Sequence, residues 1–265
     1  MKEKKVVIVT GASRGIGLAA SRLFCEKGCT VYALSRSAGD TAGVKSVVCD
    51  VTDSAKLKEV IDGIFDAEKR IDILINNAGA GISGAVEKTT LEDVKALFDL
   101  NFFAMFEAVK YTAPYMRRQG GGKIINTGSV AGMIHIPFQA FYSATKAAVE
   151  ALSNCLRGEL APFNIKVATV MPGDTRTNFT DARKKDFEKD DPDYGSRISH
   201  SIEIMEKDER GGMPPEKTAK VIYKAASSVS PKPLYTVGFM YKAVLVLDRL
   251  LPKRPVQYII NSIYG

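Results

Sequence analysis

The chain has 265 residues, of which 45% are hydrophobic, and a formal net charge of +7. This length and composition predict one sizeable α/β domain. A basic balance suggests anionic partners, such as nucleic acid, anionic lipid or a phosphate-bearing ligand. The basic residues are interleaved with acidic ones, as in DARKKDFEKDD, and this pattern is typical of a solvated face, so we expect no nucleic-acid partner.

The cysteines and the N-terminus limit the class of protein further. Four cysteines, none in a C-x-x-C pair, and two histidines argue against a zinc site or a disulfide framework and fit a reducing compartment. The apolar run at 6–10 is too short for a signal-peptide core. No run reaches the roughly 18 apolar residues needed to cross a bilayer. We therefore expect a cytoplasmic protein with no metal.

Apolar strand-like runs alternate with helical patterns along the first two-thirds of the chain. Strands are predicted at 5–10, 30–34, 44–50, 71–76, 122–128 and 165–171, and helices at 15–27, 54–66, 91–118 and 140–161. Strands that are apolar on both faces and separated by helices indicate a parallel sheet covered on both sides. The fold predicted is an α/β, Rossmann-type, doubly wound parallel sheet.

The pattern changes after Pro172. Residues 174–215 are charge-rich and poorly periodic, and we interpret them as a lid over the carboxyl edge of the sheet. A helix is expected from 214–215 to 226 and a last strand at 233–238, which completes a domain over 1–238. The amphipathic tail at 239–265 is an extension of that domain. Core packing is the favoured interpretation of the tail, with pocket cover, subunit pairing and peripheral membrane contact as alternatives.

A glycine-rich turn joins the first strand to the first helix. Gly11, Gly15 and Gly17 allow the backbone to turn tightly and to approach a pyrophosphate at the helix N-terminus. This context predicts a dinucleotide cofactor. The second strand ends in Ser35 and Arg36, where a carboxylate would favour NAD, and Arg14 lies in the turn. The two guanidinium groups and the Ser35 hydroxyl suit a 2′-phosphate, so NADPH/NADP+ is predicted.

A tyrosine and a lysine lie four residues apart in the helical stretch AFYSATKAAVEAL. Tyr142 and Lys146 share one face of this helix. The pKa of a tyrosine starts near 10, and lowering it by about 3 units needs about 4 kcal/mol. A positive charge at about 4 Å supplies roughly that energy, so Lys146 is expected to lower the pKa of Tyr142 and make it a general acid–base. Ser129, at a strand end, would donate to a carbonyl oxygen.

These motifs, in this order, resemble the short-chain dehydrogenases/reductases. The resemblance rests on TGASRGIG (10–17), NNAG (76–79), Asn101 in DLN, Ser129 with Tyr142 and Lys146, and PG (172–173). It covers roughly 4–238, and the segment around Tyr142 together with the tail looks most like the steroid and retinoid (17-beta-hydroxysteroid dehydrogenase-like) branch. It implies that Asn101 holds a water in a proton relay, that Lys146 also binds the nicotinamide ribose, and that the chain forms a homodimer.

The resemblance also implies a cofactor site that extends over the whole carboxyl edge. Its expected residues are Gly11, Ser13, Arg14, Gly15, Ile16, Gly17, Ser35, Arg36, Asp50, Val51, Asn77, Ala78, Gly79, Tyr142, Lys146, Pro172, Gly173, Thr175 and Thr177. The loop PGDTRTNF departs from the family by placing Asp174 where an apolar residue is usual, which affects the geometry expected near the carboxamide.

The expected substrate is a hydrophobic ketone, aldehyde or secondary alcohol. An apolar wall is predicted from Met133, Ile134, Ile136, Phe138 and Phe141, with His135 as an ordinary loop residue. The alternatives within the enzyme class are a 3-oxoacyl-type or general carbonyl reductase. A non-catalytic NADPH-sensing protein is the alternative from another class, and the intact set of Asn101, Ser129, Tyr142 and Lys146 argues against it.

Overall fold

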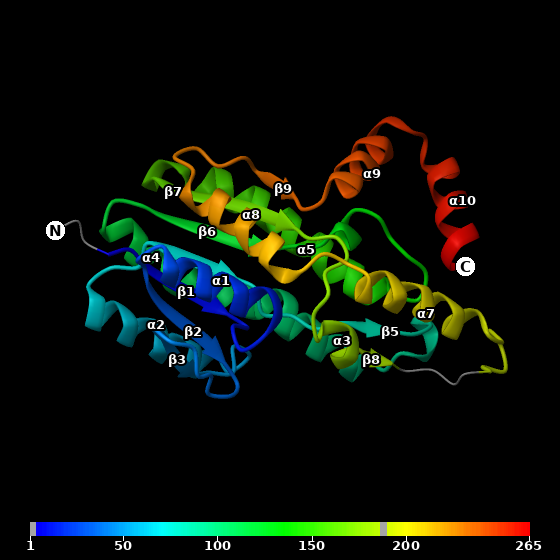
Figure 1. The fold of residues 1–265 in the computed structure, drawn as a ribbon, viewed down its shortest axis with the longest axis horizontal. Coiled ribbons are helices and arrows are strands. Elements are labelled where there is room, and N and C mark those ends of the chain that lie inside the picture. The colour runs from blue at the N-terminus through cyan, green and yellow to red at the C-terminus, as the bar shows by residue number, and fades with distance from the viewer. Residues whose placement is uncertain (1–3, 186–189) are drawn as a thin grey trace.

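A seven-stranded parallel sheet forms the centre of the molecule (Figure 1). The computed structural model describes residues 4–185 and 190–265. The sheet order is β3-β2-β1-β4-β6-β7-β9. The strands are β1 (Val6–Thr10), β2 (Thr30–Ser35), β3 (Val44–Val48), β4 (Ile73–Asn76), β6 (Gly122–Thr127), β7 (Ile165–Met171) and β9 (Leu234–Thr236). The order reverses direction between β1 and β4, which confirms the doubly wound Rossmann-type fold.

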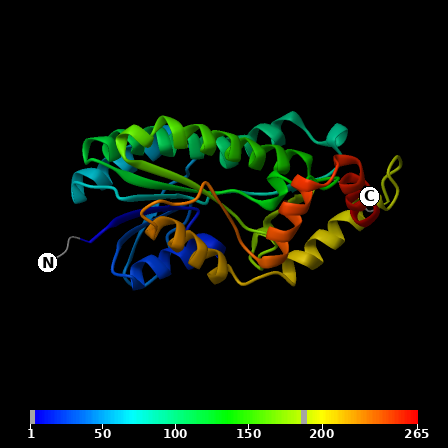
Figure 2. The same ribbon diagram turned by 90° about the horizontal axis from the view of Figure 1, so that it is seen from above.

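Helices cover both faces of the sheet (Figure 2). One face packs against α2 (Ser54–Glu68), α4 (Ala104–Arg118) and α5 (Ala140–Glu159), and the other against α1 (Gly15–Glu26) and α8 (Pro215–Ser227). Alternation along a strand explains the two cores, because Ile8 enters the first cluster whereas its neighbours Val7 and Val9 enter the second. This is why the strand sequences are apolar on both faces.

The prediction of one continuous helix over 91–118 is wrong in the middle of that range. The structure has α3 (Leu91–Phe98), a π-helical segment (Asp99–Phe103) and then α4. The wider turn buries Asn101, whose Oδ1 accepts from the Ala80 amide at 2.9 Å and whose Nδ2 donates to the Ala80 carbonyl at 3.0 Å. Hydrophobic spacing does not reveal such a turn, because the amphipathic pattern continues on both sides of it.

The charge-rich segment predicted as a poorly periodic lid is more ordered than expected. It contains α6 (Phe179–Ala182), β8 (Lys184–Lys185), which pairs with β5 (Ile82–Ser83), and α7 (Arg197–Arg210). Helix α7 buries Ile198, Ile202 and Met205 with helical spacing, a signal that the surrounding charges obscured. Residues 186–189 of this predicted segment lie outside the described residues. Short 3-10 turns occur at Val86–Lys88, Val130–Gly132 and Ala161–Phe163.

The tail forms two helices that stand as an arm beside the carboxyl end of the sheet (Figure 1). They are α9 (Phe239–Leu250) and α10 (Lys253–Tyr264). The sequence favoured core packing of the tail. Only one edge of the arm packs in this way, where Leu245, Asp248 and Ile260 are buried. Over the described part of the chain, none of the helices combines the length and the apolar character needed to cross a membrane.

Candidate active site

The carboxyl ends of β1 and β4 are joined by one threonine at the point where the sheet reverses direction. The Thr10 hydroxyl accepts from the amides of Asn77 at 3.0 Å and Ala78 at 3.1 Å. The Asn77 side chain donates back to the carbonyls of Thr10 and Gly11, each at 3.1 Å. Thr10 therefore holds the NNAG segment against the glycine turn. This role of Thr10 was not predicted from the sequence, although Thr10 directly precedes Gly11 at the end of the first strand.

The glycine turn has the close approaches expected of a phosphate cradle. Gly11 and Gly15 have positive φ angles of 64° and 55°, which favour glycine. A Cβ on Gly17 would lie 2.3 Å from the Gly11 carbonyl oxygen and 2.6 Å from Asn77 Nδ2. Helix α1 has no side-chain cap from Arg14, so its positive end is available to an anion. The turn, including Ser13 and Ile16, fits a bound pyrophosphate.

Two exposed cations flank the expected ribose site, Arg14 in the glycine turn and Arg36 directly after β2. Arg14 and Arg36 are exposed, as expected for residues that contact a 2′-phosphate. Ser35 is buried and donates to the Ser37 carbonyl at 2.7 Å. Its proton is therefore not directed to a phosphate in this structure, which departs from the role expected from the sequence. The arginines remain the groups that fit a 2′-phosphate.

Asp50 and Val51 lie at the next strand end, as expected for residues beside an adenine. Asp50 Oδ1 accepts from the Thr52 amide at 3.0 Å and from its hydroxyl at 2.8 Å. The hydrogen bond from the Thr52 amide is the largest cause of the lowered pKa of Asp50, and the positive charge of Arg36 lowers this pKa further. Val51 is buried beneath the loop. The carboxylate is thus ionised and fixed.

The candidate catalytic side chains meet at the carboxyl ends of β4 and β6. Ser129 follows β6 and lies close enough to the Tyr142 phenol to lower its pKa, and the Ser129 hydroxyl accepts from the Ala131 amide at 3.1 Å. Lys146 is buried one helical turn beyond Tyr142 and donates to the Thr127 carbonyl at 3.0 Å. Its Nζ lies 5.8 Å from the centre of the Tyr142 ring. The structure therefore brings the three predicted residues together.

Asn101 completes this group from the π-helical segment. Its Nδ2 also donates to Thr145 Oγ1 at 3.1 Å on helix α5, one residue before Lys146. A Cβ on Gly79 would lie 3.2 Å from Asn101 Oδ1 and 3.6 Å from Lys146 Nζ. The amide thus links the NNAG segment to the helix that carries the tyrosine and lysine, which is the place expected for it.

The electrostatics of the pair differ from the expectation that Lys146 lowers the pKa of Tyr142. Burial raises the pKa of Tyr142 to about 12, and the bond from Ser129 opposes this rise. Burial also lowers the pKa of Lys146 to about 8. Desolvation therefore dominates both groups, because a buried site disfavours the tyrosinate and the ammonium alike. A further positive charge in the site would favour ionisation of the phenol.

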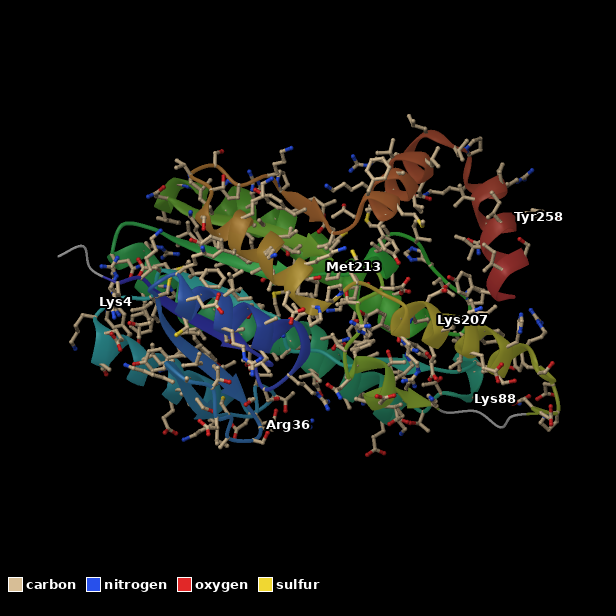
Figure 3. All side chains as sticks on the ribbon, viewed as in Figure 1. Lys4, Arg36, Lys88, Lys207, Met213 and Tyr258 are labelled. Atoms are coloured by element: carbon tan, nitrogen blue, oxygen red, sulfur yellow. The ribbon has the colours of Figure 1, made fainter. Side chains whose placement is uncertain are left out.

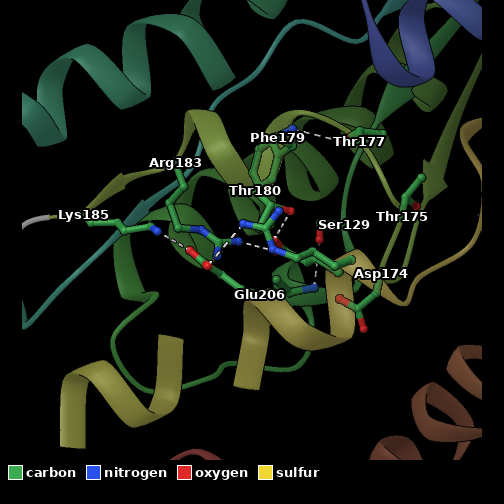
Figure 4. A network of polar contacts seen from close by, with 12 residues as sticks. Ser129, Asp174, Thr175, Thr177, Phe179, Thr180, Arg183, Lys185 and Glu206 are labelled. Atoms are coloured by element: carbon green, nitrogen blue, oxygen red, sulfur yellow. Dashed lines mark hydrogen bonds and ion pairs between the residues drawn. The ribbon is translucent and has the colours of Figure 1, made fainter. Parts of the chain in front are cut away.

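Phe179 and Thr180 of helix α6, with Arg183 directly after it, lie near Ser129 (Figure 4). The Phe179 ring lies 5.5 Å from the Tyr142 ring, centre to centre. The Arg183 side chain is 0% exposed and pairs with Glu209 of α7, which also accepts from Thr180 Oγ1 at 2.7 Å. Both charges influence the pKa of Tyr142, with Glu209 raising it and Arg183 lowering it. A lid was predicted here from the sequence, but these residues were not singled out.

The loop after β7 contacts both the glycine turn and the tail. Thr177 lies against Gly15, whose Cβ would be 3.2 Å from the threonine side chain. A Cβ on Gly173 would lie 2.2 Å from the Tyr241 ring, and the Tyr241 hydroxyl donates to Asp174. Asp174, the departure noted in the sequence, therefore anchors helix α9 to this loop. Pro172 and Thr175 are the remaining expected cofactor contacts in the loop, and the Pro172 carbonyl accepts from the Val130 amide at 3.1 Å.

The predicted apolar wall is divided among three clusters. Met133 and Ile134 pack beside Tyr241, Ile136 and Phe138 pack on α7, and Phe141 packs with Tyr142. His135 is exposed, and its Nδ1 lies 3.3 Å from the Ala131 carbonyl. It is thus an ordinary loop histidine, as expected.

A family model described as short chain dehydrogenase matches residues 5–188. This chain belongs to the short-chain dehydrogenase family. The dehydrogenase is 38% identical to a 3-ketodihydrosphingosine reductase of Bacteroides thetaiotaomicron over 99% of both chains. Family and relative together make it an oxidoreductase that acts on C=O or CH–OH groups. The steroid and retinoid branch suggested by the sequence is not distinguished by these findings.

Solved structures agree with this assignment. A short-chain dehydrogenase from Streptomyces avermitilis superposes with a TM-score of 0.84 at 31% identity, over 94% of each chain. The structure of ElxO with NADP bound has a TM-score of 0.75 at 25% identity and covers 91% of this dehydrogenase and all of that chain. The neighbour's cofactor supports a nicotinamide dinucleotide here.

Proposed function

We propose that the dehydrogenase reduces a 3-oxo group on a long-chain, amphiphilic lipid with NADPH, with Tyr142 as the general acid. The observation that carries the proposal is the 38% identity over 99% of both chains to the 3-ketodihydrosphingosine reductase, in a chain whose Ser129, Tyr142 and Lys146 meet in one buried site. A steroid or retinoid ketone remains the alternative within the same apolar substrate class.

The cofactor site fits the dinucleotide through three parts of the chain. The glycine turn would hold the pyrophosphate, Arg14 and Arg36 would bind the 2′-phosphate, and the loop from Pro172 to Thr177 would contact the nicotinamide end. Bound nicotinamide supplies or accepts the hydride in this chemistry. The exposed Arg14 in the glycine turn and Arg36 after β2 support NADPH over NADH.

The proton chemistry belongs to residues of the chain. Tyr142 would deliver its phenolic proton to the substrate oxygen, while the Ser129 hydroxyl, which lies beside the phenol, would stabilise the negative charge that develops there. Lys146, held by the Thr127 carbonyl, places an ammonium group beside the phenol. Phe179 and the ion pair of Arg183 with Glu209 exclude water from the same space. Each of these groups thus assists the same step, the transfer of the Tyr142 proton to the substrate oxygen.

A matched substrate panel tests the proposal. NADPH and NADH oxidation would be measured with 3-ketodihydrosphingosine, a 3-oxoacyl thioester, a steroid ketone and retinal, using Tyr142→Phe as the control. We expect the sphingoid ketone with NADPH to give the highest kcat/KM. A higher value for the steroid or retinal would overturn the substrate class. Cofactor binding without turnover of any ketone would favour the NADPH-sensing alternative.

We also propose a homodimer through the outer faces of α4 and its neighbour α5. Phe103 and Phe106 at the start of α4 are exposed, and large aromatic side chains are enriched at subunit interfaces. Light scattering of the wild type and of Phe103→Ser/Phe106→Ser tests this. A monomeric wild type would contradict it.

A further inference from the structure

Helix α9 exposes a continuous apolar face that no other part of the described chain covers. At about 100° per residue, one arc of about 160° contains Phe239, Met240, Val244, Val246, Leu247 and Leu250. All six are exposed, Phe239 by 88% and Leu250 by 75%. The opposite side, with Tyr241, Leu245 and Asp248, packs on the protein. Soluble surfaces rarely expose such a contiguous stripe without a partner.

Helix α10 exposes further apolar residues at the end of the arm. Tyr258, Ile259 and Ile263 are exposed, and Figure 3 shows Tyr258 pointing away from the body of the molecule. Tyr264 instead packs on α7, where its hydroxyl donates to Asp208 at 3.2 Å, and Ile260 is buried. The arm is therefore anchored on its inner side and apolar on its outer side.

Basic residues border the apolar face. Lys242 and Arg249 fall between the exposed arc and the packed arc of α9, and Lys253 and Arg254 begin α10. The sole acidic residue of 239–265, Asp248, is buried and accepts from Lys253 at 2.7 and 2.8 Å. An apolar face with a cationic border matches the boundary between acyl chains and anionic headgroups.

We propose that the outer face of α9, continued by α10, docks on the surface of an anionic lipid bilayer. A second copy of the chain is the less suitable occupant, because antiparallel two-fold packing on this face would set its cationic border against the same border of the partner, without acidic partners. The proposal does not depend on the reaction. Because Tyr241 of α9 lies on Gly173 and Asp174, the docked face would adjoin the loop that leads to the site.

Vesicle flotation of the full chain tests the proposal. The wild type is compared with Met240→Gln/Leu247→Gln/Leu250→Gln, on vesicles of phosphatidylcholine with phosphatidylglycerol and on phosphatidylcholine alone. The matched control is Val86→Gln/Leu91→Gln/Val229→Gln, three exposed apolar residues on other parts of the surface. We expect the wild type and the control to float with the anionic vesicles, and the α9 variant to remain unbound.

The charge contribution is measured with Lys242→Gln/Arg249→Gln. Each removed cation should weaken binding to the anionic vesicles by about fivefold, and added salt should weaken the wild type similarly. Light scattering and activity on a water-soluble ketone are recorded for every variant. Absence of wild-type binding to anionic vesicles overturns the proposal. A shift of the α9 variant to a smaller assembly, without vesicle binding by the wild type, would assign the face to a subunit interface instead.

Discussion

The Tyr142→Phe substitution removes a single oxygen from the centre of the proposed chemistry. Phenylalanine keeps the ring that packs against Phe179 at 5.5 Å, so the fold should lose only the hydrogen bond with Ser129. One hydrogen bond contributes about 1 kcal/mol, or about 2–4 °C in Tm for a chain of this size. The general acid contributes about 10²- to 10⁴-fold, and kcat should fall by that factor.

The pKa of Tyr142 sets a second, sharper expectation. Bringing it from about 12 to near 7 requires about 7 kcal/mol, whereas one positive charge at about 4 Å supplies about 4 kcal/mol. Lys146 therefore does not suffice alone, and the positive charge of the oxidised nicotinamide must contribute. Alcohol oxidation should consequently rise with pH through an apparent pKa well below 12, and this dependence should be absent in Tyr142→Phe.

Three measurements cover both effects: initial rates with NADPH and the best ketone, initial rates with NADP+ and the corresponding alcohol across pH, and titration of reduced-cofactor fluorescence. The variant should bind NADPH with nearly the wild-type Kd while turnover is lost. Near-normal turnover in Tyr142→Phe would refute the assignment of the proton donor. A wild-type profile with no ionisation across the accessible pH range would refute the electrostatic reasoning but leave the proton donor in place.

Three further substitutions test the expected cofactor site and the buried lysine. Arg36→Asp should weaken NADPH binding by about 10- to 100-fold and spare NADH, since it removes a charge-assisted bond to the 2′-phosphate; equal losses for both cofactors in a fluorescence titration would contradict this. Gly17→Ala should cost about 1–3 kcal/mol in urea unfolding and abolish cofactor binding, because its Cβ meets the Gly11 carbonyl, whereas Gly63→Ala, with open space around its Cβ, should be neutral or stabilising. Lys146→Met should be more stable than wild type at pH 7 by up to about 3 kcal/mol, since burial lowers the lysine pKa from 10.5 to about 8. The wild type regains stability as pH rises from 8 to 10.5, because its folded state releases the proton first, so a gap that stays constant over that window would contradict the cause.

The sequence determined the sheet and the positions of the chemistry. Doubly apolar runs predicted the strands, since each must fill a core on both faces, as Ile8 and Val7 do. Fixed spacing predicted Tyr142 and Lys146 on one face of a helix, because 3.6 residues per turn is a local property. The glycine turn could be predicted because its conformation is also local: Gly11 and Gly15 adopt positive φ angles within the turn itself.

Only the tertiary structure decided what depends on contacts between distant segments. The π turn that buries Asn101 exists because its side chain bonds Ala80, which lies 21 residues earlier. The ion pair of Arg183 with Glu209 joins two helices within a segment whose charges suggested solvent. Burial raised the Tyr142 pKa where spacing alone predicted a fall, because desolvation depends on everything packed around a group. The apolar residues of α9 were visible in the sequence, but packing on one edge left the rest of them facing outward.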